Sequence, residues 1–115
     1  MAKNLEDQKR ETFSVFDDLQ SKQRLPEMAI VDFHFVPIKN TANWSGFMSE
    51  IKDMGYKSEP YEDEGTLEIS TRPIALSAER IWFHEKQFTI VGERYGFAPD
   101  GWGFFGIENN RDLMS

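Results

Sequence analysis

Cysteine is absent from this sequence of 115 residues, which excludes a disulfide scaffold, thiol catalysis and cysteine-ligated zinc. Histidine occurs only twice, and the two positions do not have the spacing of a zinc motif. No nucleotide-binding glycine loop and no serine-nucleophile motif occurs. We therefore expect no metal and no cofactor, and we expect that the protein is not an enzyme.

Basic residues are fewer than acidic residues. The sequence has 13 Lys and Arg and 20 Asp and Glu, which gives a formal net charge of −7. An acidic surface repels phosphate backbones and anionic headgroups, so we expect no direct nucleic-acid binding and no membrane binding. No apolar run reaches the length of a membrane span, and the charged N-terminus lacks the apolar region of a signal peptide. These features predict a soluble, cytoplasmic protein whose partner carries a basic segment.

Aromatic residues, by contrast, make up 14% of the sequence and include ten Phe. That much aromatic area can form the core of one small domain without a disulfide or a metal. Hydrophobic periodicity predicts helices over residues 4–22, 43–54 and 77–95, and strands over residues 28–36, 56–61, 66–72 and 102–107. A turn is predicted at residues 99–101.

The order of these elements predicts an α+β fold of the ferredoxin-like βαββαβ type. Its four-stranded antiparallel sheet has two helices on one face, and an N-terminal helix is added. The first and third strands are expected at the centre. We divide the chain into an N-terminal helical extension (residues 1–27), a single domain (residues 28–108) and a tail (residues 109–115).

The strand over residues 28–36 has two different faces. Phe33 and Phe35 lie on the apolar face, which we expect to meet the helices. Asp32 and His34 lie on the other face, where they form either an acid–base or metal site or an ordinary polar sheet surface with cross-strand charge pairs. The second histidine, His84, is interpreted as lying on the surface or the flank of the last helix.

The hairpin between residues 56 and 72 is acidic at its turn, and no Lys or Arg occurs from Ser58 to Thr71. This acidic lobe is suited either to bind a segment rich in Arg and Lys or to protect an edge strand from aggregation. The five candidate partner-binding residues of the lobe are Glu59, Glu62, Asp63, Glu64 and Glu68.

A glycine-rich stretch follows the last helix and contains the sequence Asp100, Gly101, Trp102 and Gly103. Two interpretations are open for Trp102: it is an anchor in an interface, or it fills the end of the core.

This Asp-Gly-Trp-Gly motif occurs together with Met54-Gly55-Tyr56, the acidic hairpin and Tyr95-Gly96. In these features, residues 31–108 resemble the RraB family, the regulators of ribonuclease E activity. The resemblance implies a ferredoxin-like fold and a protein that inhibits ribonuclease E in bacterial RNA degradation. The chain departs from the family in lacking its long acidic C-terminal tail.

The resulting hypothesis is a non-enzymatic, protein-binding regulator with ribonuclease E as its candidate partner. Two alternatives stay open. One is a small enzyme or ligand-binding domain that uses Asp32 and His34, and the other is a nucleic-acid-binding module on the sheet face that the helices leave uncovered.

Overall fold

Helices and strands alternate along the chain in the computed structural model, which describes residues 4–38 and 40–107. The elements, in chain order, are α1 (Leu5–Lys22), β1 (Met28–Pro37), α2 (Trp44–Asp53), β2 (Lys57–Tyr61), the short 3-10 helix η1 (Glu62–Glu64), β3 (Thr66–Ser70), β4 (Ile74–Ala75), α3 (Ala78–Arg94) and β5 (Phe97–Gly106). The protein is thus an α+β protein, as the sequence predicts. Glu108 and the expected tail, residues 109–115, lie outside the described residues.

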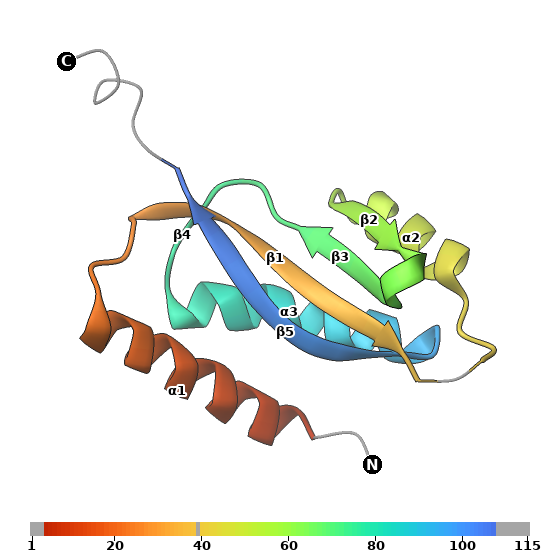
Figure 1. The fold of residues 1–115 in the computed structure, drawn as a ribbon, viewed down its shortest axis with the longest axis horizontal. Coiled ribbons are helices and arrows are strands. Elements are labelled where there is room, and N and C mark those ends of the chain that lie inside the picture. The colour runs from red at the N-terminus through yellow and green to blue at the C-terminus, as the bar shows by residue number, and fades with distance from the viewer. Residues whose placement is uncertain (1–3, 39, 108–115) are drawn as a thin grey trace.

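All strand pairs of the sheet are antiparallel, and β1 lies at its centre (Figure 1). β3 pairs with one side of β1 and β5 with the other, while β2 pairs with β3. The described residues form five strands rather than four, because β4 pairs with the first two residues of β1. Two residues are too few to show the alternation from which strands were predicted, which is why β4 was missed.

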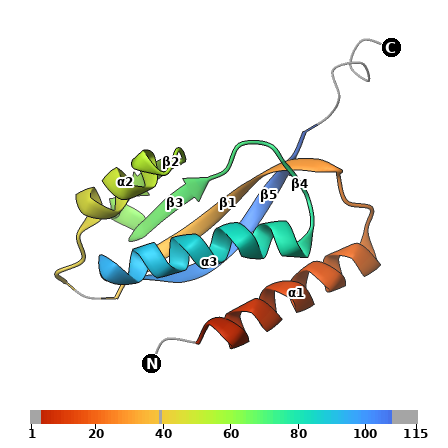
Figure 2. The same cartoon turned by 180° about the vertical axis from the view of Figure 1, so that it is seen from behind.

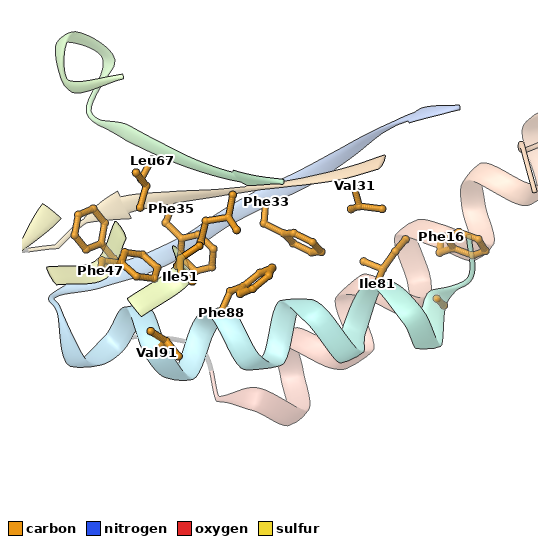
Figure 3. Close-up of a cluster of buried hydrophobic side chains, with 13 residues drawn as sticks. Phe16, Val31, Phe33, Phe35, Phe47, Ile51, Leu67, Ile81, Phe88 and Val91 are labelled. Atoms are coloured by element: carbon orange, nitrogen blue, oxygen red, sulfur yellow. The ribbon is translucent and has the colours of Figure 1, made fainter. Parts of the chain in front are cut away.

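The three helices lie on one side of this sheet (Figures 1 and 2). Buried side chains fill the space between the sheet and α3, as Figure 3 shows for Phe33, Phe88 and Ile81. The rings of Phe33 and Phe88 meet edge to face with centroids 5.4 Å apart. The opposite face of the sheet, which we call the open face, is covered by no helix among the described residues.

Side-chain caps and glycines set the ends of the helices. The side chains of Asn4, Asn43 and Ser77 each accept a hydrogen bond from a backbone N–H three residues further on, at the starts of α1, α2 and α3. Gly55 and Gly96 follow α2 and α3 with φ of 94° and 82°, a conformation in which glycine carries no steric cost. The predicted boundaries of α2 and α3 rest on these residues.

The N-terminal helix α1 packs against α3, partly through polar groups. Phe16 joins the hydrophobic core, and the buried carboxylate of Glu85 accepts hydrogen bonds from Thr12 Oγ1 and Gln8 Nε2. Gln8 Nε2 also donates to Thr89 Oγ1 at 2.9 Å. Buried polar groups need such partners, so this cluster fixes the position of α1 along α3.

Two local predictions were wrong. His84 is 7% exposed, so it lies neither on the surface nor on an exposed flank of α3. Its Nδ1 lies 2.9 Å from the carbonyl oxygen of Arg80, and its ring packs perpendicular to the ring of Tyr56. The expected turn at residues 99–101 lies inside β5, which begins at Phe97. Between the pairs Phe33–Trp102 and Phe35–Pro99, β5 has one residue more than β1, so the turn-forming residues Asp100 and Gly101 make a β-bulge.

Candidate functional site

The open face carries the polar residues that alternate with the core residues of β1. On β1, Asp32 pairs with Ser70 of β3 and His34 pairs with Glu68. Ser70 Oγ donates to Asp32 Oδ1 at 2.6 Å, and His34 Nε2 lies 3.1 Å from Glu68 Oε2. Each polar side chain of β1 therefore has its own partner on the neighbouring strand.

The acidic lobe lies at the β2–η1–β3 end of this face. Glu59 stands directly opposite Glu68 in the ladder between β2 and β3. Glu62, Asp63 and Glu64 form η1 between the two strands, and all three are exposed. The structure thus brings the five predicted residues to one end of the sheet, two of them on the open face and three at the turn.

The acidic lobe produces a negative electrostatic field, and this field affects the pKa of a neutral side chain beside it, Tyr61. Tyr61 follows Glu59 by two residues and shares its face of β2. The pKa of Tyr61 is raised above its ordinary value of 10.0, first by the charge of Glu68, then by burial and by the charges of Glu59 and Glu64. A phenolate would add one more negative charge to this group, so the neutral form is favoured.

Like charges that face each other across strands destabilise a sheet, and Glu59 and Glu68 are such a pair. His34 lies on the other side of Glu68 and is half exposed. The arrangement suits a surface that attracts cations.

Asp32 and His34 were the candidate acid–base pair, and the structure pairs them with different side chains. Asp32 is 7% exposed, and its Oδ1 accepts the Ser70 hydroxyl. A groove along β2 is lined by Ser70 but by neither Asp32 nor His34. Within residues 4–38 and 40–107, no three His, Asp or Glu side chains are grouped so that they could hold a metal ion.

The four residues of the Asp-Gly-Trp-Gly motif have different surroundings. Asp100 and Gly101 are exposed in the bulge. Trp102 lies on the helix side opposite Phe33, packs against the core, and lines a hollow of about 200 Å³ between α1, α3 and β5. Gly103 lies opposite Asp32, on the open face. Of the two interpretations of Trp102, these contacts favour the one in which it fills the end of the core.

A groove of about 890 Å³ runs along β2, beside α2, and was not predicted from the sequence. It is lined by Met48 and Lys52 of α2, by Tyr56, and by Lys57, Ser58 and Glu59 of β2, among others. The sequence signal that points to it is Pro60, because proline in a strand is typical of a sheet edge. The sequence predicted the edge but not the space beside it.

A protein-family model described as "Regulator of ribonuclease activity B" (RraB) matches residues 9–104 of the chain. The match begins within α1 and ends in β5, so it includes the acidic lobe and the Asp-Gly-Trp-Gly motif. No curated protein matches the chain. No helix in the described part of the chain is long and apolar enough to cross a membrane.

Proposed function

The chain belongs to the RraB family of regulators of ribonuclease activity, and from this we propose that it is a non-enzymatic inhibitor that binds ribonuclease E in the bacterial cytoplasm. The proposal goes beyond the family description in four respects: the identity of the ribonuclease, the direction of the effect, the absence of catalysis by the chain itself, and the location in the bacterial cytoplasm. The observation that carries it is the position of the acidic lobe, which lies on exposed surface within the matched region.

The acidic lobe supports a partner with a basic segment. Glu62, Asp63 and Glu64 are exposed on a turn, where their charges meet an approaching protein without first being desolvated. Such charges act mainly by steering the encounter and by selecting partners of opposite charge. A segment rich in Arg and Lys on the ribonuclease is the complementary partner.

The alternatives have weaker support. On the open face, Lys57 lies opposite Ser70, and the acidic residues Asp32, Glu59 and Glu68 lie on the same face. This excess of negative charge does not suit a phosphate backbone. Asp32 and His34 are paired separately, which does not favour an acid–base site. The order β2-β3-β1-β5 of the four longer strands, with α2 and α3 on one face, supports a ferredoxin-like arrangement to which β4 is added.

The test is a cleavage and binding assay with purified ribonuclease E and a triple variant of the lobe, Glu62→Lys, Asp63→Lys and Glu64→Lys. The wild-type protein is expected to bind the ribonuclease and slow its cleavage of RNA. Three reversed surface charges are expected to weaken binding by about tenfold and to flatten its dependence on salt, because each exposed pair contributes only a fraction of a kcal/mol.

The matched control reverses three exposed acids elsewhere, Asp17→Lys, Glu27→Lys and Glu93→Lys. It has the same net charge as the lobe variant, so it separates a local contact from the overall charge of the protein. Equal loss of binding in both variants would remove the lobe from the proposal. Wild-type protein that neither binds ribonuclease E nor changes its cleavage would contradict the proposed function.

A further inference from the structure

Among the residues that the structure describes, no strand pairs with the backbone groups on the outer edge of β2. Thr71 N donates to the carbonyl oxygen of Val31 at 3.0 Å, so the backbone of Thr71 points toward β1. Backbone direction alternates along an antiparallel strand. The backbone groups of Leu67 and Ile69 therefore also point toward β1, while those of Glu68 and Ser70 point toward β2.

The same alternation continues into β2. Glu59 pairs with Glu68 and Lys57 with Ser70, so Lys57 and Glu59 form their backbone hydrogen bonds with β3. The backbone groups of Ser58 and Pro60 therefore point outward, away from β3. Pro60 has no N–H to leave unpaired, and Ser58 offers both an N–H and a C=O to an additional strand.

The groove beside this edge has room for such a strand. Ser58 lines it, and Met48 and Tyr56 supply its apolar wall. An extended peptide in this position would form backbone hydrogen bonds with Ser58 and place alternate side chains in the groove, the recognition mode in which a peptide extends a sheet.

The charges along the groove change sign from one end of β2 to the other. Lys57 begins the strand, and Lys52 lies in the last turn of α2, which leads into it. Glu59 follows on the same face, and the acids of η1 come directly after the strand. A peptide that is basic throughout would be attracted at one end and repelled at the other.

We propose that an extended segment of the partner adds to the sheet as a strand along β2, centred on Ser58, with a basic residue beside Glu59 and η1 and an acidic residue beside Lys57 and Lys52. This proposal rests on the proposed function for the existence of a protein partner and adds the geometry and charge order of the bound segment. Charge complementarity at both ends of the groove selects this occupant.

The test uses three synthetic peptides built on alternating Val and Thr: one with Arg near its N-terminus and Glu near its C-terminus, one with these charges exchanged, and one with Arg at both ends. The protein is compared with the double variant Lys57→Glu, Glu59→Lys, which keeps the net charge and exchanges one charge at each end of the groove, while Lys52 and η1 are unchanged. One mixed peptide is expected to bind the wild-type protein about fivefold tighter than the other, and this difference is expected to fall to about twofold or less in the variant.

Residue-resolved amide exchange by NMR then locates the bound peptide. At a peptide concentration about ten times the Kd, exchange of the Ser58 amide is expected to slow by about tenfold, because only the free protein leaves this amide open. The Glu59 amide, which already points toward β3, is the internal control and is expected to change little.

Equal affinities of the two mixed peptides, or an unchanged Ser58 amide, would overturn strand addition. Tightest binding by the peptide with two Arg, without protection of Ser58, would also overturn it and would indicate docking on the acidic lobe alone. The ribonuclease assay with the lobe variant is run in parallel. Loss of binding there would leave the proposed function standing even if strand addition fails.

Discussion

The two faces of β1 differ although they alternate residue by residue along one strand. On the helix side, Phe33 and Phe35 are at most 1% exposed and contact rings from α2 and α3. On the open face, Asp32 and His34 contact polar side chains of β3. The helix side provides the apolar burial that stabilises the fold, and the open face contributes polar and charged side chains, of which His34 and Glu68 are partly exposed. Substitutions on the first face should affect folding, and those on the second should affect recognition.

The largest expected effect is the loss of a core ring. Phe33→Ala is predicted to lower the free energy of unfolding by about 3–5 kcal/mol, because it removes a fully buried aromatic side chain and leaves a cavity beside Phe88. Unfolding in urea measures this loss.

The neighbouring substitution His34→Ala is the control for that prediction. It removes a half-exposed side chain and its contact with Glu68, so the change in unfolding free energy is expected to stay within about 1 kcal/mol. Similar losses for both variants would break the distinction between the two faces.

The sequence was informative where one physical signal dominates. Alternation along β1 separated Phe33 and Phe35 from Asp32 and His34. Ser77 marked the start of α3, and Asn43 was one of three candidate caps for α2, with Asn40 and Thr41. Elsewhere, contacts between distant segments decided the outcome. His84 is buried because Tyr56, far away in the sequence, packs on its ring. Asp100 and Gly101 form a bulge because the strand continues past them to pair with β1.

The candidate site was predictable to the same extent. The charges of the acidic lobe are visible in the sequence, but the pairing of Glu59 with Glu68 depends on the register between β2 and β3. The groove along β2 depends in addition on the position of α2. Neither the register nor the helix position follows from local periodicity, which is why Lys57 and Ser58 were not among the predicted site residues.

A smaller effect on stability is expected from adding one methyl group to the buried layer between sheet and helices, or one to the open face. Gly92 lies in α3, and a Cβ there would come 2.9 Å from Phe47 Cζ, in the buried layer. Gly92→Ala is predicted to lower the unfolding free energy by about 1 kcal/mol, since overpacking outweighs the better helix propensity of Ala.

Gly103 gives the matched substitution on the open face, where a Cβ would have no neighbour within 4 Å. Gly103→Ala is predicted to leave stability unchanged or to raise it by about 0.5 kcal/mol, because Ala loses less backbone entropy on folding than Gly. Thermal unfolding of both variants tests the pair. Destabilisation by Gly103→Ala would show that the open face is packed as closely as the helix side.

The smallest effect is electrostatic and concerns the open face alone. Glu68 is the largest cause of the raised pKa of Tyr61, so Glu68→Gln is predicted to lower the Tyr61 pKa toward 10.0. A raised pKa means that the folded protein holds the phenolic proton more tightly than the unfolded chain. The stability due to this group is therefore complete below about pH 10 and is lost as the pH rises through the pKa of the folded state. Glu68→Gln should reduce that loss.

Residue-specific NMR titration of the tyrosine rings measures this pKa, and Tyr95 provides the control. The pKa of Tyr95 is also raised, but mainly because its hydroxyl donates a hydrogen bond to Glu50, at 2.7 Å from Oε1. Glu50→Gln should therefore move the pKa of Tyr95 and not that of Tyr61, while Glu68→Gln should do the opposite. If Tyr61 does not respond to Glu68→Gln, the negative field of the acidic lobe does not extend over the open face, and steering of a basic partner would have to come from η1 alone.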